Sequence, residues 1–431
     1  MKLITTALLL VSCFSAFAQK VNKLIKQEDV TRIISTLAAD DMRGRSALDE
    51  KSIDKAASFI EKEFLQIGLK PLPGLSGFRQ DFSSYFKTET TSLTVSLDGK
   101  AVAPADVILM SDAGKISLTT GIPTAIVEKD KSFREALRPF FRDTVSKIVF
   151  VVPEHEKDFH QMREYFAGPR LTEAGKTKKS TIIFVLSNPV TEFSVQAAQS
   201  QTPFRMTNVV GMLEGKQQKD EMVVFSGHYD HIGIQTPTEG DSIANGADDD
   251  ASGTTAVIEL ARYFKKIKKN NRTLIFVAFT AEEIGGYGSR YFSQQLNPDK
   301  VVAMFNIEMI GKPSKWGQHS AFITGFEKSD FGEILQRNLS GTPFEFHPDP
   351  YPQQNLFYRS DNATLARLGV PAHSISTDQI DVDPYYHTVN DEVETLDMTN
   401  VTAAIRAIAL SSRTIVAGKE TPRRVDKKDV R

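Results

Sequence analysis

The sequence predicts an α/β protein: a three-layer α/β/α sandwich around a mainly parallel, mixed sheet, with a small strand-rich inserted domain. Two observations lead to this prediction. From residue 207 to residue 416, short apolar runs alternate with amphipathic helical patterns, which is typical of a parallel sheet covered by helices on both faces. Between residues 90 and 203 the pattern changes to short alternating runs separated by charged segments, which indicates a separate unit rich in strands. The 431 residues suffice for two or three such units.

The elements follow one another in a simple order. Between residues 27 and 68 apolar side chains recur at helical spacing, which predicts two amphipathic helices. The predicted strands of the later part of the chain are 209–213, 222–225, 274–279, 301–307, 321–324 and 372–376. The predicted helices that alternate with them are 252–269, 287–296, 331–339, 362–368 and 401–416.

These elements predict five segments. The expected division is a signal peptide (1–18), N-terminal helices that pack on the main α/β domain (19–89), an inserted lid domain (90–203), the main α/β domain (204–418) and a polar tail (419–431).

The N-terminus has the composition of an export signal. A lysine precedes an apolar run, and the small-x-small sequence Ala16-Phe17-Ala18 precedes Gln19, so cleavage after residue 18 and a periplasmic or extracellular location are expected. Cys13 lies in a loose lipobox-like context and could instead be a lipidated first residue, but the run after it is apolar where lipoproteins usually turn polar. Because Cys13 is the single cysteine, cleavage at Gln19 excludes disulfides and thiolate catalysis.

Composition and charge exclude other classes of protein. With 40% hydrophobic and 25% charged residues the chain has an ordinary globular composition. Lys and Arg number 52 against 54 Asp and Glu, a net charge of −2, so we expect no nucleic-acid partner. No other stretch approaches the roughly 20 apolar residues of a membrane helix, so no stable membrane insertion is expected. The oligomeric state cannot be deduced from the sequence.

Ionisable residues follow three of the predicted strands, where sites form in parallel sheets. The residues after strands 222–225, 274–279 and 301–307 are His228, Asp230, Glu282, Glu283 and Glu308. Apolar strands usually end in turn residues. Three strands that end instead in acidic residues or histidine together indicate a functional site.

Two further segments supply ionisable groups. Residues 248–250 are three successive aspartates before a helix, and His387 lies in a later loop. Each group also has an ordinary structural interpretation. The aspartates could cap the helix, the pair at 282–283 could be a solvated loop, and His387 alone indicates little.

Several carboxylates in one cleft point to bound metal. Like charges at close range raise one another's pKa, so the carboxylates stay ionised together only if cations compensate them. Two imidazoles with several carboxylates suit zinc. A second ion nearby would require a carboxylate that bridges both.

Six segments occur in a fixed order and together resemble one family. They are Gly227-His228-Tyr229-Asp230, residues 246–253 (GADDDASG), Ala281-Glu282-Glu283 followed by Gly288-Ser289, residues 306–311 (NIEMIG), residues 358–361 (YRSD) before residues 369–372 (GVPA), and Tyr386-His387-Thr388. This pattern resembles the secreted two-zinc aminopeptidase family, which also includes glutamate carboxypeptidase, glutaminyl cyclase and the non-catalytic transferrin receptor. Residues 90–203 resemble the family's protease-associated insertion only loosely.

The resemblance implies two zinc ions per chain. It places His228 and Glu308 on one ion, Glu283 and His387 on the other, and Asp249 between them. The family commonly has Asp where this chain has Glu308, one methylene longer, so the affinity and geometry of that site come into question. The family's usual His after Ser-Asp is Asn362 here, and no metal role is assigned to it.

The resemblance also implies roles around the ions. Asp230 would orient the His228 imidazole and fix its tautomer. Glu282 would be the general base that takes a proton from water and passes it to the leaving amine. Tyr386 is a candidate to stabilise the oxyanion, although a packing role fits it equally well.

The expected function is that of an exported zinc aminopeptidase that acts on peptide substrates. The alternatives on the same metal site are a carboxypeptidase, a dipeptidase or a glutaminyl cyclase. A binding protein on an inactive scaffold is disfavoured, because every ligand position and the base position hold a competent residue. The preferred N-terminal side chain and the natural substrate cannot be deduced from the motifs.

Overall fold

The computed structural model describes residues 20–130, 132–141, 143–167, 170–175 and 180–430, so the predicted signal peptide and Cys13 lie outside the described residues. The chain forms two compact units. The large unit contains the chain up to Asp81 and again from Met206 onward, and the small unit contains Phe82–Arg205. Among the described residues no helix combines the length and apolar character needed to cross a bilayer.

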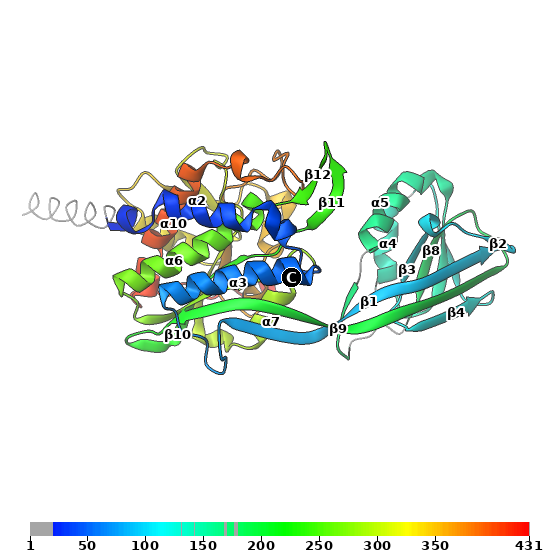
Figure 1. The fold of residues 1–431 in the computed structure, drawn as a ribbon, viewed down its shortest axis with the longest axis horizontal. Helices are drawn as coiled ribbons and strands as arrows, with labels where there is room; N and C mark the ends of the chain where they lie inside the picture. Colours follow the sequence, from blue (N-terminus) through cyan, green and yellow to red (C-terminus); the bar gives the residue numbers. More distant parts are fainter. Residues whose placement is uncertain (1–19, 131, 142, 168–169, 176–179, 431) are drawn as a thin grey trace, which may run out of the picture. The chain divides into compact units, whose positions relative to one another are not determined.

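A twisted mixed sheet forms the centre of the large unit (Figure 1). Its strands, in spatial order, are β16 (Glu345–Pro348), β15 (Ser320–Ile323), β17 (Ala372–Ser376), β14 (Val301–Ile307), β10 (Gln218–His228), β13 (Arg272–Phe279) and β9 (Phe193–Leu213). The sheet continues through β1 (Arg79–Leu97) to β2 (Lys100–Ala101). Strand β10 pairs in parallel with both β13 and β14, whereas β9 and β15 join their neighbours β13 and β17 antiparallel.

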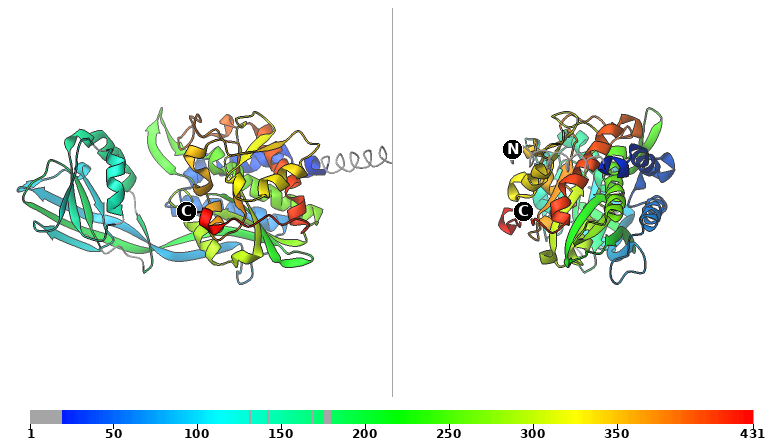
Figure 2. Two further views of the ribbon diagram at one scale, coloured as in Figure 1. Left: turned by 180° about the vertical axis from the view of Figure 1, so that it is seen from behind. Right: turned by 90° about the vertical axis from the view of Figure 1, so that its left-hand side faces the viewer.

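Helices cover both faces of this sheet (Figure 2). One layer contains α2 (Gln27–Leu37), α3 (Glu50–Ile67), α6 (Gly253–Ile267), α8 (Phe331–Asn338) and α10 (Met398–Ser411), and α11 (Arg413–Val416) follows it. The other layer contains α7 (Tyr287–Gln294) and α9 (Asn362–Ala366).

Side-chain alternation along β10 explains this three-layer arrangement. Phe225 belongs to the hydrophobic core on the side of the sheet covered by α2, α3, α6 and α10. Its ring lies against Phe264 of α6, with ring centroids 5.4 Å apart. Its neighbour Val224 belongs to the second core, which contains Phe292 of α7 and Leu365 of α9. Both faces of a central strand are therefore apolar, as expected where helices cover both sides of a parallel sheet. The predicted three-layer α/β class is confirmed.

Arg45 ties the N-terminal helices to the loops beyond the sheet. It lies at the end of a short 3₁₀ segment, Asp40–Arg45, and is fully buried. Its guanidinium donates hydrogen bonds to four backbone carbonyls, those of Leu37, Tyr229, Asn245 and Gly246, at 2.5 to 2.9 Å. A buried guanidinium needs such a full set of acceptors, because an unpaired buried charge is strongly destabilising.

The small unit has its own sheet, with strand order β3 (Val107–Met110), β8 (Ile182–Leu186), β6 (Lys147–Val151) and β5 (Thr124–Val127). On one face, Val149 and Val151 of β6 pack with α4 (Phe133–Phe141) and α5 (Glu156–Ala167). On the other face, Ile148 and Phe150 pack with apolar residues of β1, β4 (Lys115–Thr119) and β9. Strand β7 (Arg170–Glu173) pairs with β1.

The structure extends or adds some elements. Predicted strand 209–213 is the end of β9, which is 21 residues long. The predictions omitted β16 and a separate hairpin of β11 (Gly233–Thr238) and β12 (Asp241–Ala244). These strands are short or mostly exposed, so they lack the continuous apolar run that identifies a buried strand.

Candidate metal centre

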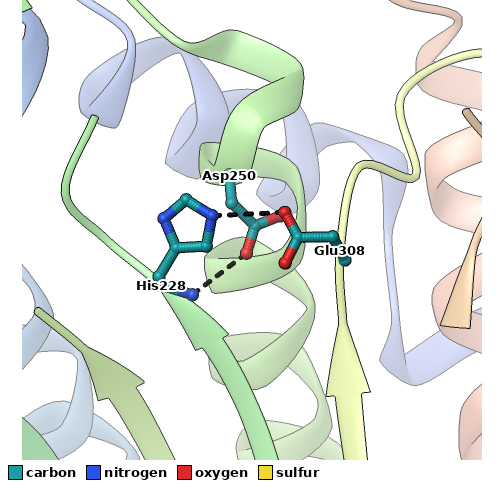
Figure 3. Close-up of side chains that lie close together, drawn as sticks. All are labelled: His228, Asp250 and Glu308. Atoms are coloured by element: carbon teal, nitrogen blue, oxygen red, sulfur yellow. Dashed lines mark hydrogen bonds and ion pairs between the residues drawn. The ribbon is translucent and has the colours of Figure 1, made fainter. Parts of the chain in front are cut away.

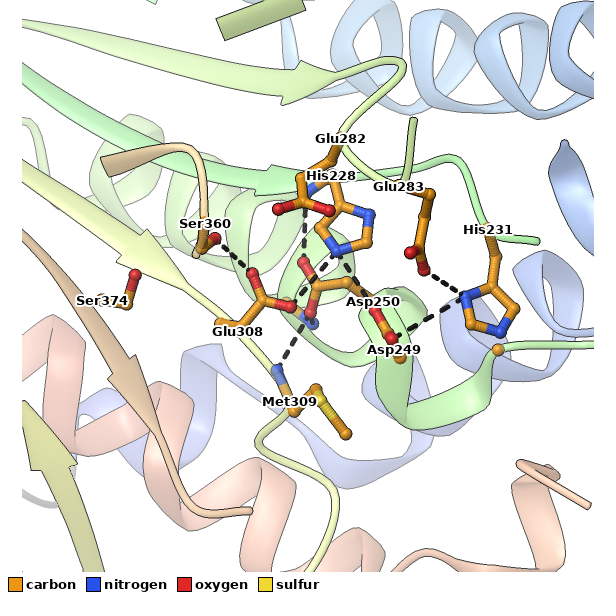
Figure 4. Close-up of polar contacts among 12 residues, drawn as sticks. His228, His231, Asp249, Asp250, Glu282, Glu283, Glu308, Met309, Ser360 and Ser374 are labelled. Atoms are coloured by element: carbon orange, nitrogen blue, oxygen red, sulfur yellow. Dashed lines mark hydrogen bonds and ion pairs between the residues drawn. The ribbon is translucent and has the colours of Figure 1, made fainter. Parts of the chain in front are cut away.

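The carboxyl edge of the central parallel strands carries a cluster of imidazoles and carboxylates (Figure 4). His228 is the last residue of β10, and Glu308 directly follows β14. Glu282 and Glu283 lie in the turn after β13, and Asp249 lies just before α6. The sheet thus brings residues 80 positions apart to one place.

The five predicted ligand residues converge. His228 Nε2 lies 3.1 Å from Asp249 Oδ1 and 3.2 Å from Glu308 Oε1. His387 Nε2 lies 3.2 Å from Asp249 Oδ2 and 3.0 Å from Glu283 Oε2. The two oxygens of Asp249 therefore face two different imidazoles, the arrangement expected of a carboxylate that bridges two cations.

Electrostatics favour cations at this place. Although burial lowers the pKa of His387, its hydrogen bonds to Asp249 and Glu283 raise that pKa to about 10. For the carboxyl group of Asp249, burial acts in the opposite direction and raises the pKa. The hydrogen bonds from His228 and His387 outweigh this effect and hold the pKa of Asp249 well below its usual range. The carboxylates thus draw protons onto the imidazoles. Metal ions would replace these protons, so metal affinity should fall as the pH falls.

His231 is a functional candidate that the sequence analysis missed. Its Nδ1 lies 2.8 Å from Glu283 Oε1 and 3.9 Å from Asp249 Oδ2, and the residue is almost fully buried. His231, Asp249 and Glu283 each offer one ligand atom, all within 4.8 Å of one another. The available signal was its position three residues after His228, where the chain leaves the same strand.

Asp250 organises the backbone around the cluster (Figure 3). Its carboxylate accepts hydrogen bonds from the backbone N–H groups of His228, Gly253 and Met309, at 3.0 to 3.1 Å. The bond from Gly253, the first residue of α6, means that the capping interpretation holds for Asp250, whereas Asp249 faces the imidazoles. One ligand atom each of His228, Asp250 and Glu308 also lies within 4.8 Å of the others.

Asp391 supports the same loop from the other side. Its carboxylate accepts hydrogen bonds from the backbone N–H groups of Asp248 and Asp249 at 2.9 to 3.2 Å. It comes from a loop after β17, and no motif in the sequence marked it. Asp250 and Asp391 together fix the backbone on which Asp249 is mounted.

Asp230 contacts both His228 and the glutamate turn. His228 Nδ1 donates to the backbone carbonyl of Asp230 at 3.0 Å, while the Asp230 carboxylate lies 3.8 Å from the same nitrogen. That carboxylate accepts the backbone N–H groups of Glu282 at 3.1 Å and Glu283 at 3.4 Å. Asp230 therefore aligns the imidazole through its main chain and positions the glutamates through its side chain.

The remaining predicted residues, Glu282 and Tyr386, border a pocket beside the cluster. Glu282 lies on its wall, and burial, followed by neighbouring carboxylates such as Asp361, raises the pKa of Glu282. The Tyr386 ring stacks on His387 with centroids 3.9 Å apart, and its hydroxyl lies 3.5 Å from an Arg359 nitrogen. Tyr386 thus stands beside the cluster with its hydroxyl available to the pocket.

Glu308 has a partner that the sequence did not indicate. The Ser360 hydroxyl donates to Glu308 Oε2 at 2.5 Å, while Oε1 faces His228. This bond holds the longer side chain in one rotamer. Asn362 contributes to the scaffold instead, because its amide donates to the carbonyls of Phe357 and Ala372.

The donor set fits zinc. Imidazole nitrogens and carboxylate oxygens are ordinary zinc ligands, and Asp249 can face two ions at once. His228 and Glu308 would hold one ion, while Glu283, His387 and the nearby His231 surround the place of the other. This is the chemistry of a metallohydrolase on an α/β scaffold.

Comparison with known proteins supports that class. Residues 208–411 match the model of peptidase family M28. A protein named "Probable zinc metalloprotease" from Leptosphaeria maculans is 36% identical over 126 residues, covering 28% of this chain and 29% of that protein. Aminopeptidase YwaD from Bacillus subtilis is 23% identical over 248 residues, covering 51% of this chain and 47% of YwaD. The chain thus spans less than half the length of these curated relatives.

The fold is shared with a solved aminopeptidase. The structure of the aminopeptidase from Aneurinibacillus sp. strain AM-1 aligns with a TM-score of 0.59 at 16% identity, covering 96% of this chain and 98% of that one. The match to peptidase family M28 covers residues 208–411, and the fold of the solved aminopeptidase covers nearly the whole chain. The family resemblance drawn from the six segments is confirmed.

We expect the two metal positions to differ in affinity. The position near His231 has an additional imidazole, whereas the other depends on Glu308, whose extra methylene must be accommodated. Stepwise dialysis against a chelator, followed by metal analysis, should show the two zinc ions leaving at different chelator concentrations. Ser360→Ala should shift only the more weakly held ion, because it removes the bond to Glu308. Simultaneous loss of both ions in wild type and variant would contradict this expectation.

Proposed function

We propose that this chain is an exported, zinc-dependent aminopeptidase that binds two zinc ions and removes N-terminal residues from peptides. The observation that carries the proposal is the position of Asp249 between His228 and His387, with Glu282 on the wall of the adjoining pocket. The match of residues 208–411 to peptidase family M28 and the aminopeptidases among the similar proteins support it.

The residues present can perform the hydrolysis. Zinc, when bound, supplies Lewis acidity that polarises the scissile carbonyl and makes water a stronger acid. Glu282 accepts the proton of the attacking water and then delivers it to the nitrogen of the departing amine, so the proton returns to the products. The hydroxyl of Tyr386 can donate a hydrogen bond to the developing oxyanion. Asp230 holds Glu282 in place through the backbone N–H of that residue.

A panel of substrates tests the proposal against its alternatives. The zinc-loaded protein should hydrolyse aminoacyl 4-nitroanilides and peptides with a free N-terminus. It should leave their N-acetylated forms intact, because an aminopeptidase requires the free amine. Cleavage of the N-blocked peptides from the carboxyl end would instead indicate a carboxypeptidase. Cleavage of dipeptides only would indicate a dipeptidase, and cyclisation of N-terminal glutamine a glutaminyl cyclase.

Export is a separate part of the proposal and depends on the pattern of residues 1–18. Mass spectrometry of the protein from its native cells should give a mature chain that begins at Gln19. A mass that corresponds to a lipidated Cys13 as the first residue would indicate a membrane anchor instead.

A further inference from the structure

The pocket beside the metal centre extends to a buried acid that the proposed mechanism does not use. Asp378 lines the same pocket as Glu282 and His387. It lies two residues beyond the end of β17, and its backbone N–H donates to Ser376 Oγ at 3.1 Å, so its position is fixed by the sheet. The residue is 3% exposed.

Neither oxygen of the Asp378 carboxyl group accepts a hydrogen bond from any N–H or O–H donor of the described residues. Such a group is costly to bury, so a native protein usually supplies a partner for it. The nearest cation is already engaged, because Lys312 Nζ lies 2.6 Å from Asp383 and 3.3 Å from Asp248. One carboxylate oxygen from each of Asp248, Asp378 and Asp383 lies within 4.8 Å of the others, so the three acids can all be ionised only if more positive charge than that of Lys312 is present.

The pocket wall includes four apolar side chains, alongside polar ones and Arg359. Met309, Phe322, Leu356 and Ile380 line the pocket. Apolar walls suit an alkyl chain, and a carboxylate beyond them suits a positive charge at the end of that chain. A divalent ion fits less well, because Lys312 already supplies a positive charge to the same group of acids.

We propose that this pocket takes the side chain of the substrate's N-terminal residue and that Asp378 selects lysine and arginine there. The inference rests on the proposed aminopeptidase function. The aliphatic stem of the substrate side chain packs against Phe322, Leu356 and Ile380, and its cationic head pairs with Asp378.

Without a substrate Asp378 holds a proton, and a hydrogen bond with the Asp383 side chain favours that protonated form. Burial, followed by the charges of Asp248 and Asp383, raises the pKa of Asp378 to about 9. A cationic side chain that enters the pocket replaces this proton as the compensating charge. Neutral side chains of equal length gain only the contacts with the apolar walls.

The test compares the 4-nitroanilides of lysine and norleucine, which share the butyl stem and differ in the terminal ammonium group. We expect the zinc-loaded wild type to show a kcat/KM at least about tenfold higher for lysine. Asp378→Asn should lower that lysine-to-norleucine ratio by about 100-fold, because it removes the buried charge that pairs with the ammonium, while norleucine turnover stays within a few-fold of wild type. Asp381→Asn is the matched control, since Asp381 is an exposed acid three residues away that contacts Gln354.

The outcomes separate this inference from the proposed function. Norleucine turnover without a lysine preference in the wild type overturns the role of Asp378 and leaves the aminopeptidase proposal standing. A ratio unchanged in Asp378→Asn overturns that role as well. No turnover of either substrate overturns the aminopeptidase proposal, and the inference with it. Norleucine turnover by Asp378→Asn also shows whether this variant folds. If the variant does not fold, the lysine-to-norleucine ratio of the wild type still tests the inference.

Discussion

Replacing Glu282 with glutamine is expected to lower kcat by about 100-fold or more while zinc content stays unchanged. Glutamine keeps the shape of the side chain but cannot accept the proton of the attacking water. Glu282 lies on the pocket wall, and its backbone N–H is held by Asp230, so the substitution should not disturb the turn. Metal analysis and steady-state kinetics on the same preparation check both parts of this expectation.

Its neighbour provides the matched control. Glu283 contacts His231 at 2.8 Å and His387 at 3.0 Å, so Glu283→Gln should lose metal as well as activity. Loss of zinc in Glu282→Gln would make Glu282 a ligand, and unchanged turnover would remove its role as base.

Asp249→Asn should lower activity by on the order of 1000-fold and weaken the binding of both zinc ions. Asp249 presents one oxygen to His228 and the other to His387, and an amide offers only one neutral oxygen in their place. Glu308→Gln is the comparison, since its carboxylate faces His228 alone among the imidazoles and its loss should affect a single ion. Equilibrium dialysis with metal analysis would count the ions in each variant. Retention of two tightly held ions in Asp249→Asn would rule out the bridging position.

Asp249 should also contribute to stability in the metal-free protein. Hydrogen bonds from His228 and His387 hold its pKa well below the usual value despite burial. A carboxyl group with a lowered pKa in the folded state stabilises that state above its unfolded pKa, and this contribution disappears as the pH falls toward the lowered value.

The sequence allowed the fold class and much of the cluster to be predicted, because both depend on local patterns. A buried parallel strand appears in the sequence as a continuous apolar run. For this reason β14 and β17 have the bounds that the sequence predicted. Since parallel strands end at one edge, residues after three strand ends had to be neighbours. The structure places the predicted ligand residues together, and their binding of zinc stays a prediction.

Other features depend on tertiary contacts that no local pattern reveals. His231 contacts Glu283, and its backbone N–H donates to the carbonyl of Arg45, almost two hundred residues earlier in the chain. Asp391 acts by accepting backbone N–H groups, and Asp230 orients His228 through its own carbonyl. A residue type indicates which side-chain chemistry is available, but it does not indicate which main-chain groups will lie within hydrogen-bonding distance.

The discontinuous large unit has a consequence for the order of folding during synthesis. The helices before Asp81 are made first, but the strands against which they pack come only after Met206. The small unit is completed in between, so it can fold while α2 and α3 still lack their apolar partners. Three of the four carbonyls that accept hydrogen bonds from Arg45 belong to Tyr229, Asn245 and Gly246. These residues are synthesised after the small unit. The residues of the metal centre, from His228 to His387, all follow the small unit along the chain, so the centre can assemble only after the second half of the chain has been made.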